Sequence, residues 1–212
     1  MKFRTLVASL GLETVATIEE RLCPDQYIGR LRELELAGAI SARDAAENRP
    51  TGAGVLLVLE SPHIEEFKAE PAPARGKTGL HIARYLRQVV GSTAFDDFPV
   101  TLVNAVRHQC SLGCSPTLFR DKVFAAVWAN GGRGDFVDRL RVLSRPGDLV
   151  VCCCTKGRSR TPAMQLRQLV YAAIREALPG VQVSRRTHPS SWFSKRNRLY
   201  EWATASNEAL TN

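Results

Sequence analysis

Glu60, Asn104 and His188 are three residues of different chemistry, and each follows a short apolar run of the sequence. The amide of an asparagine can donate and accept hydrogen bonds, so it can read the polar edge of a heterocyclic ring. An imidazole can stabilise a departing anion, and a carboxylate can offset a developing positive charge or orient a water molecule. Brought together by the fold, these three groups would suit the removal of a base from a sugar.

The apolar runs predict strands that are buried on both faces of a sheet. They cover residues 55–59, 100–103, 149–153 and, more weakly, 181–184. Helical patterns lie between and beside them, over residues 79–90, 118–128, 136–143 and 163–178. Strands and helices in alternation predict a parallel sheet with helices on both faces, in which the loops at the carboxyl ends of the strands share one edge. We therefore expect Glu60, Asn104 and His188 at that edge.

Residues 1–50 differ in character from the rest of the chain. They include a stretch rich in Leu, Glu and Arg that predicts helix, and residues 48–54, with one Pro and two Gly, separate them from the first strand. We expect a helical N-terminal extension over residues 1–50 and an α/β domain over residues 51–212. This domain should be a three-layer α/β/α sandwich with a short, mainly parallel central sheet.

The composition is that of an ordinary globular protein, with 212 residues of which 44% are hydrophobic and 24% charged. It excludes fibrous and disordered chains. No stretch reaches the ~20 consecutive apolar residues of a membrane helix, and the first residues lack the pattern of an export signal. The six cysteines include three in a row at residues 152–154, and none has the spacing of metal ligands. We expect a cytoplasmic protein without a membrane partner, a metal or another cofactor.

The positive charge is concentrated in one part of the chain. The whole sequence has 29 Lys and Arg against 21 Asp and Glu, and residues 156–198 alone hold ten basic residues and one acidic residue. Trp192 and Phe193 lie within this stretch. Basic side chains beside aromatic ones are typical of a surface that binds a polyanion with stackable bases, so we expect DNA, duplex or single-stranded, as the partner. A merely solvated basic face is the alternative.

Four short motifs follow one another along the chain. They are Glu60-Ser61-Pro62-His63 after the first strand, residues 73–79 (Pro-Ala-Arg-Gly-Lys-Thr-Gly), Asn104 after the second strand, and His188-Pro189-Ser190 after the fourth. In order and approximate spacing this set resembles the uracil-DNA glycosylase superfamily over about residues 54–200. The resemblance implies a uracil-DNA glycosylase-like fold and the hydrolytic removal of a flipped-out base from DNA, which leaves an abasic site.

The resemblance also implies roles for single residues. Asn104 would read the flipped base, His188 would stabilise the base as it leaves, and Glu60 would supply the catalytic carboxylate. Trp192 would fill the gap that the flipped nucleotide leaves in the duplex. The base pocket would comprise Ser61, Pro62, His63, Ala74 and Asn104, and the DNA contacts would be Gly76, Lys77, Lys156, Arg158, Ser190, Ser191, Trp192, Lys195 and Arg196.

The sequence departs from the family pattern at three of these positions. Ser61 stands where the best-known branch has a water-activating Asp, so the carboxylate role falls to Glu60, which resembles a Glu of other branches. His63 stands where Tyr or Gly is common, and it could itself move a proton. Ala74 replaces the base-stacking Phe of one branch, which leaves room for a base larger than uracil. We therefore expect a monomeric, monofunctional DNA glycosylase for a deaminated or modified base, in DNA repair or in attack on modified foreign DNA.

Two other interpretations stay open. Residues 154–161 (Cys-Thr-Lys-Gly-Arg-Ser-Arg-Thr) lie between a predicted strand and a predicted helix and resemble the phosphate-binding loop of cysteine-dependent phosphatases. In such an enzyme Cys154 would be the nucleophile and Arg160 would hold the phosphate, although Cys153 stands where that family usually has His. The other interpretation is a protein that binds nucleic acid without catalysis, because the water-activating Asp is absent.

Overall fold

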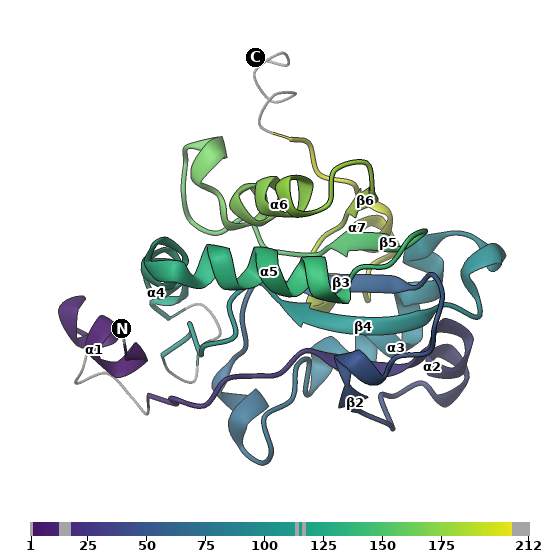
Figure 1. The fold of residues 1–212 in the computed structure, drawn as a ribbon, viewed down its shortest axis with the longest axis horizontal. Coiled ribbons are helices and arrows are strands. Elements are labelled where there is room, and N and C mark those ends of the chain that lie inside the picture. The colour runs from purple at the N-terminus through teal and green to yellow at the C-terminus, as the bar shows by residue number, and fades with distance from the viewer. Residues whose placement is uncertain (1, 13–17, 113–114, 116–117, 205–212) are drawn as a thin grey trace.

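The computed structural model describes residues 2–12, 18–112, 115 and 118–204. Within these ranges the centre of the molecule is a sheet of six strands in the order β2-β1-β4-β3-β5-β6 (Figure 1). The strands are β1 (Gln26–Arg30), β2 (Asp44–Ala45), β3 (Val55–Leu59), β4 (Pro99–Asn104), β5 (Leu149–Cys152) and β6 (Gln182–Arg185). The last four are parallel to one another, whereas β1 is antiparallel to both β4 and β2.

Helices cover both faces of the sheet (Figure 1). One face carries α2 (Leu31–Ala37), α3 (Lys77–Val90) and α7 (Lys195–Leu199), and the other carries α4 (Arg120–Val127), α5 (Arg133–Leu143) and α6 (Leu166–Ala177), with α1 (Phe3–Ser9) against α4. One-turn 3₁₀ helices cover Ala46–Asn48, Ile64–Phe67, Thr93–Phe95, Pro162–Met164 and Pro189–Ser191, and a wider turn, Trp128–Gly132, joins α4 to α5. In the described ranges, no helix combines the length and the apolar character that a membrane span needs.

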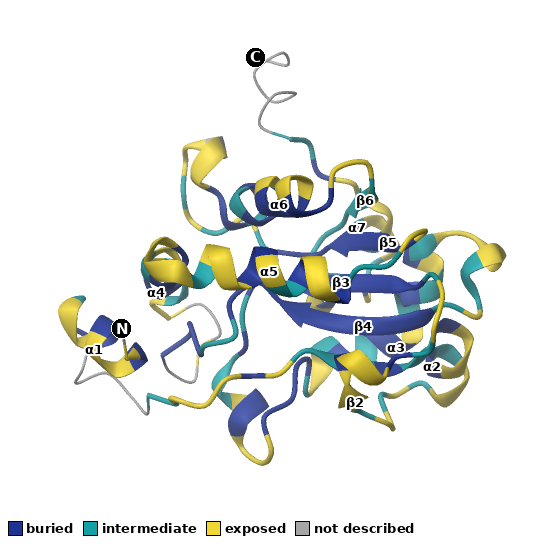
Figure 2. Ribbon diagram, in the orientation of Figure 1, coloured by how far each residue is buried: buried dark blue, intermediate teal, exposed yellow. Residues whose placement is uncertain are grey.

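The central strands are buried because helices cover both of their faces. Every residue of β3 and of β4 is buried (Figure 2). Along β3, Leu56 and Val58 join the apolar cluster under α4, α5 and α6. Val55, Leu57 and Leu59 join the cluster under α2 and α3. Alternate side chains of a strand point to opposite faces, so a strand between two helical layers must be apolar at every position. This explains the unbroken apolar run at residues 55–59.

The predicted α/β class and the mainly parallel sheet with helical layers are confirmed. The predicted strand at residues 55–59 coincides with β3, and the runs at 100–103, 149–153 and 181–184 correspond to β4, β5 and β6. The predicted helices at 79–90, 118–128, 136–143 and 163–178 correspond to α3, α4, α5 and α6, with ends shifted by up to three residues. Such shifts are usual at helix ends, where the last turn has few fixed hydrogen bonds.

The prediction of a helical extension over residues 1–50 is wrong for residues 26–30 and 44–45, which form strands, although α1 and α2 also lie in this segment. β1 and β2 come from this segment and belong to the same sheet as the rest of the chain. β1 pairs with β4 over Gln26↔Leu102 and Tyr27↔Thr101, and only its Ile28 is buried. A five-residue strand with one buried side chain gives little periodic signal, which is why the sequence pattern did not indicate a strand.

The order of the parallel strands defines where the chain reverses its direction across the sheet. From β3 the chain passes to β4 on one side, and it then crosses back over β3 to β5 and β6 on the other side. In open α/β sheets, ligands bind beyond the carboxyl ends of the strands at such a reversal. The loops that follow β3 and β5 are therefore the first place to look for a functional site.

Candidate active site

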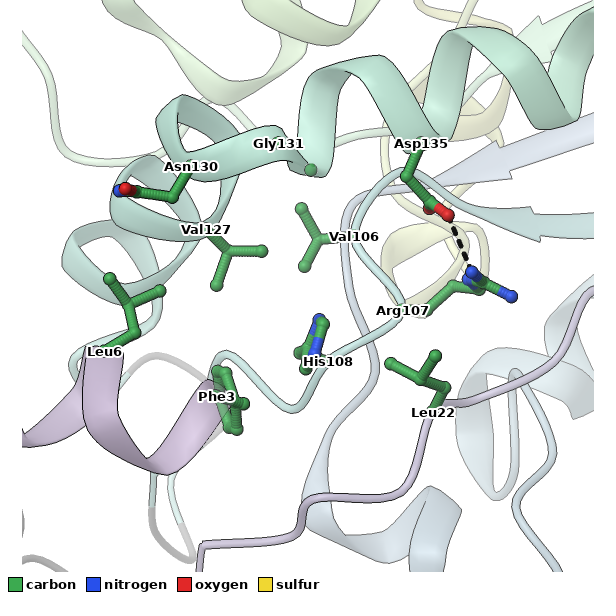
Figure 3. Close-up of a pocket in the computed structure, with 11 residues that line it drawn as sticks. Phe3, Leu6, Leu22, Val106, Arg107, His108, Val127, Asn130, Gly131 and Asp135 are labelled. Carbon is green, nitrogen blue, oxygen red and sulfur yellow. Dashed lines mark hydrogen bonds and ion pairs between the residues drawn. The ribbon is translucent and has the colours of Figure 1, made fainter. Parts of the chain in front are cut away.

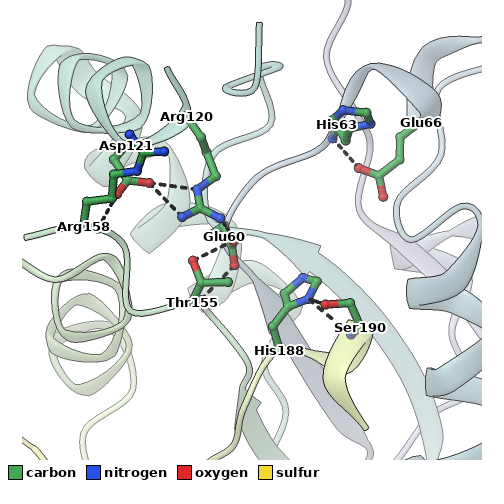
Figure 4. A network of polar contacts seen from close by, with 9 residues as sticks. All are labelled: Glu60, His63, Glu66, Arg120, Asp121, Thr155, Arg158, His188 and Ser190. Atoms are coloured by element: carbon green, nitrogen blue, oxygen red, sulfur yellow. Dashed lines mark hydrogen bonds and ion pairs between the residues drawn. The ribbon is translucent and has the colours of Figure 1, made fainter. Parts of the chain in front are cut away.

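A cavity of about 680 Å³ opens beyond the carboxyl ends of the parallel strands. Glu60 follows β3, Thr155 comes shortly after β5, and His188 lies beyond the end of β6. Arg120, the first residue of α4, and Glu66, from the 3₁₀ turn after β3, also line the cavity (Figure 4). The fold thus brings two of the three predicted catalytic residues, Glu60 and His188, to one cavity.

Glu60 is a buried carboxylate with well-defined partners, and only 4% of its surface is exposed. Its Oε2 accepts the backbone N–H of Thr155 at 3.0 Å, and its Oε1 accepts the hydroxyl of Thr155 at 3.0 Å. The guanidinium of Arg120 donates to Oε1 at 3.2 Å. A buried charge is tolerated when it is paired and hydrogen-bonded, so Glu60 is held as a fixed negative charge at the cavity wall.

Arg120 also connects Glu60 to the loop after β5. Its guanidinium forms a second ion pair, with Asp121 at 2.8 Å. Asp121 in turn accepts the backbone N–H of Arg158 at 2.5 Å. Gly157 has a φ of +75°, and a Cβ there would lie 2.9 Å from the carboxylate of Asp121, so the loop needs glycine at this position. Sequence reasoning missed Arg120, because nothing in the sequence marks the first residue of this helix.

His188 is held in one tautomer by the turn that follows it. The backbone N–H of Ser190 donates to Nδ1 of His188 at 3.3 Å, and the Ser190 hydroxyl lies 2.9 Å from the same nitrogen. Burial lowers the pKa of His188, and Arg120 lowers it further, although Glu60 opposes them. The imidazole is therefore neutral near pH 7, with its proton on Nε2. A neutral ring of this kind can donate a hydrogen bond to an anion.

Glu66 is a cavity residue that sequence reasoning missed. It is 8% exposed, and its Oε2 accepts the backbone N–H of His63 at 2.7 Å. Its Oε1 accepts the backbone N–H of Ala74, which has a left-handed φ of 55°. Burial raises the pKa of Glu66 to about 7, against the effect of these hydrogen bonds. The available sequence signal was its place three residues after His63, the spacing of a capping box.

Asn104, the third predicted catalytic residue, does not line this cavity. Its side chain is buried, and its Nδ2 lies 3.6 Å from the thiol of Cys23. The antiparallel pairing of β1 with β4 carries the segment before β1 past the end of β4, where the N–H of Cys23 donates to Arg107 O at 2.9 Å. This segment covers Asn104, and sequence reasoning missed the cover because it treated residues 1–50 as a separate extension.

The predicted base-pocket residues divide into two groups. Ser61 and His63 line the cavity with Glu60. Pro62 and Ala74 are buried and lie outside its lining, so neither offers surface to a molecule in the cavity. Of the predicted DNA contacts, Gly76, Lys77 and Ser190 line the cavity, whereas Ser191 donates its hydroxyl to His188 O at 2.8 Å.

The prediction that Trp192 inserts into DNA disagrees with its position. Trp192 has no exposed surface (0%), and its indole N–H donates to Thr187 O at 2.9 Å. It packs in the apolar cluster under α2 and α3, which anchors the loop that carries His188. The next residue, Phe193, is 69% exposed and is the aromatic side chain that this loop presents to solvent.

The predicted basic surface is present in part. Arg185 and Arg186 pair with Glu201, and the guanidinium of Arg198 lies 4.4 Å from the ring centroid of Tyr85. Around the loops that follow β5 and β6, five exposed basic side chains have no carboxylate within ion-pair distance among the described residues; they are Lys156, Arg158, Arg160, Lys195 and Arg196. These five flank the loops that follow β5 and β6 and are available to phosphates.

The environment of Cys154 does not suit a phosphatase nucleophile. Its thiol is 2% exposed, and burial raises its pKa well above the ordinary value. A thiolate nucleophile needs the opposite shift. The residues after it form an irregular loop and the short turn Pro162–Met164, and α6 begins only at Leu166, so no helix N-terminus follows Cys154 directly.

A second, smaller cavity of about 290 Å³ lies between α1 and the turn that joins α4 to α5 (Figure 3). Phe3 and Val106 contribute to its apolar lining, and the ring of His108 lies 4.7 Å from that of Phe3. The charged groups at its rim are already paired, since Arg107 donates to Asp135. This cavity lacks the unpaired basic surroundings of the first, which is therefore the better candidate for a functional site.

No group of three or more His, Cys, Asp and Glu side chains in the described ranges could hold a metal ion. Comparisons with protein-family models, with curated proteins and with solved structures find no match.

Proposed function

We propose that the chain is a DNA glycosylase that hydrolyses the N-glycosidic bond of a flipped-out base and leaves an abasic site. The observation that supports this most strongly is the joint lining of one cavity by a neutral, oriented imidazole and a fixed carboxylate, His188 and Glu60. The imidazole of His188 can stabilise the base as it leaves as an anion. The carboxylate of Glu60 can stabilise the positive charge that develops on the sugar.

The reaction follows from these two environments. The bond between the sugar C1′ and the base nitrogen breaks, and its electron pair stays on the base. His188 Nε2–H donates a hydrogen bond to the base anion, while Glu60 stabilises the positive charge on the sugar. A water molecule then forms the new bond to C1′, and the proton that it loses finally reaches the base anion. The products are an abasic sugar and the free base.

The cavity also supports a base larger than uracil. A volume of about 680 Å³ exceeds what one pyrimidine requires, and Ala74 lies outside the lining, so no aromatic side chain from that position narrows the space. We infer a deaminated purine or a bulky modified pyrimidine as the substrate class. Uracil excised as fast as every larger base would contradict this part of the proposal.

The DNA would lie across the exposed basic residues beside the cavity. Lys156 and Arg158 extend from one loop, and Lys195 and Arg196 from the start of α7. Phe193, between the His188 loop and α7, takes over the stacking role first assigned to Trp192. Base flipping requires a few kcal/mol of unstacking energy, which aromatic stacking and phosphate contacts offset.

The test is a glycosylase assay on purified protein, followed by alkaline cleavage at abasic sites. Duplex and single-stranded oligonucleotides would carry uracil, hypoxanthine, hydroxymethyluracil or a bulky modified cytosine. We expect cleavage of at least one substrate, and we expect His188→Ala to slow it about 10²-fold or more. His108→Gln is the matched control, because His108 lies at the smaller cavity and should leave the rate unchanged.

Other outcomes separate the alternative functions. Tight binding of the whole panel without excision would favour a nucleic-acid-binding protein. Hydrolysis of a phosphate ester that is lost in Cys154→Ser would favour the phosphatase, despite the buried thiol. Excision that survives His188→Ala at full rate would remove His188 from the mechanism.

A further inference from the structure

The cavity holds a second carboxyl group, Glu66, whose surroundings differ from those of Glu60. Glu60 forms an ion pair with the guanidinium of Arg120, which donates to it at 3.2 Å. Glu66 instead accepts hydrogen bonds from neutral backbone N–H groups, those of His63, Ala74 and Arg75. Two carboxyl groups of one site that have different surroundings can have different roles in acid–base chemistry.

The position of Glu66 is compatible with a role in the reaction. It lines the same cavity as Glu60 and His188. Figure 4 shows Glu66 apart from Glu60, with no contact drawn between the two carboxyl groups. The backbone N–H groups of His63, Ala74 and Arg75 donate to the Glu66 carboxyl group, and a carboxylate has about four acceptor positions, which leaves one for a water molecule. The backbone bonds from two loops fix the carboxyl group, so it needs no rearrangement before it acts.

We propose that Glu66 is the general base that accepts the proton of the attacking water. This inference rests on the proposed glycosylase function. As the water oxygen bonds to C1′, its proton passes to Oε2 of Glu66, while the electron pair of the broken C1′–N bond leaves with the base beside His188. The proton on Glu66 then returns through solvent to the base anion. Atoms and charges balance, and no other reactant is needed.

The charged neighbours of Glu66 support this assignment. Cys23, Arg43 and Arg75 face it from other segments, with His63 on its own turn, and Glu60, Arg120 and His188 lie across the cavity. Arg43 lowers the pKa of Glu66, but burial dominates and raises it to about 7. A general base works best when its pKa lies near the working pH. Glu66 meets this condition without a cation in contact.

The test is the pH dependence of base excision by the full chain, on whichever oligonucleotide of the panel is cleaved fastest. In the wild type, the single-turnover rate should rise through an inflection near pH 7 as Glu66 ionises. Glu66→Gln should lower this rate about 10²- to 10⁴-fold and remove the inflection. Its affinity for the oligonucleotide should stay within about threefold of the wild type, because the Gln leaves the basic surface unchanged. The control is Glu176→Gln, since Glu176 is exposed, pairs with Arg133 and does not line the cavity; it should keep both rate and inflection.

The outcomes distinguish this proposal from the proposed function. Excision by Glu66→Gln that keeps the inflection overturns the role of Glu66 alone, because a merely structural residue would change the rate at every pH. No excision by the wild type on any substrate overturns both proposals. If Glu66→Gln does not fold, Glu66→Asp keeps a carboxyl group for the same N–H donors. A shifted inflection in that variant supports the proposal, and an unchanged inflection overturns it.

Discussion

Arg120 donates to Glu60 across 3.2 Å at the wall of the cavity, and both side chains are largely buried. The pair joins the start of α4 to the end of β3, two segments that lie 60 residues apart in the chain. Because both charges are shielded from water, each depends on the other for its stability. The pair therefore links the stability of the fold to the chemistry of the site.

Arg120→Met should destabilise the protein strongly. It removes the partner of a buried carboxylate, and breaking a buried ion pair in this way costs about 3–5 kcal/mol. Urea denaturation would measure the free energy of unfolding. Arg141→Met is the control, because its pair with Asp138 is exposed, and it should change the free energy by less than about 1 kcal/mol. Equal small effects of both substitutions would show that Glu60 finds another partner.

Glu66 should make the free energy of unfolding depend on pH. Its pKa is raised from 4.5 to about 7 in the folded state, so the folded protein holds a proton that the unfolded chain has lost between these values. This contribution is complete below pH 4.5 and is lost as the pH rises through about 7. The lowered pKa values of His108 and His188 act in the opposite direction, because their contribution is lost as the pH falls below 6.5.

The Glu66 contribution is isolated by comparing the wild type with Glu66→Gln. The stability of the wild type relative to that variant should decrease from about pH 5 to about pH 7.5, because only the wild type must bury a charge at the higher pH. Denaturation series at several pH values would measure this difference. A difference that is the same at every pH would mean that Glu66 titrates normally.

Trp192 and Phe193 should respond in opposite ways to alanine substitution. Trp192→Ala removes a buried ring and should destabilise the fold by about 3–5 kcal/mol. Phe193→Ala should leave the melting temperature nearly unchanged. It should lower the rate of excision from duplex DNA about 5- to 100-fold, the effect expected when the stacking of roughly one base is lost. Thermal unfolding and excision assays would separate the two effects. Full activity of Phe193→Ala on duplex substrates would exclude Phe193 from DNA contact.

The unpaired basic side chains should determine the salt dependence of DNA binding. Each phosphate contact contributes about 0.9 to the slope of log affinity against log salt concentration. Substitution of both Lys156 and Arg158 by Gln should therefore reduce the slope by about 2. The double variant Arg133→Gln/Arg141→Gln is the control. Both arginines are exposed on α5 and already form ion pairs, Arg133 with Glu176 and Arg141 with Asp138. An unchanged slope in the first double variant would place the DNA elsewhere.

Asn104→Ala should have a small effect on excision. Asn104 lies under the segment that contains Cys23 and outside the cavity, so we expect a change of less than about tenfold, or about 1.4 kcal/mol in the barrier. The lost contact with Cys23 should lower stability by about 1 kcal/mol. Excision and denaturation assays check both values. A loss of about 10²-fold with an intact fold would mean that Asn104 reaches the base after the cover moves.

The sequence allowed the centre of the fold to be predicted, but not its edge. β3, β4 and β5 are buried on both faces, so each appears as an apolar run that few other structures produce. β1 and β2 have mixed polarity and pair beside the core, so their strand character comes from β4 and not from their own residues. Local patterns cannot reveal such pairing.

The same distinction applies to the site. Glu60 and His188 were predictable because they follow strands whose carboxyl ends must meet at one edge. Asn104 satisfied the same rule, but the register of β1 brings Cys23 over it, and that register is not readable from a single segment. Arg120 and Glu66 lie at a helix start and in a one-turn helix, where position depends on how distant loops pack. Three-dimensional structure was needed to find them.

The edges of the sheet also bear on how the chain behaves beside other copies of itself. A long, flat edge strand offers free backbone groups with which a second chain can pair, and such pairing leads to aggregation. Here one edge is β2, which has only two residues, and beyond the other edge Arg186 forms a bridge with Glu201. The fully buried strands β3 and β4 lie between neighbours on both sides. The order of the strands thus keeps the most aggregation-prone segments of the chain away from the edges of the sheet.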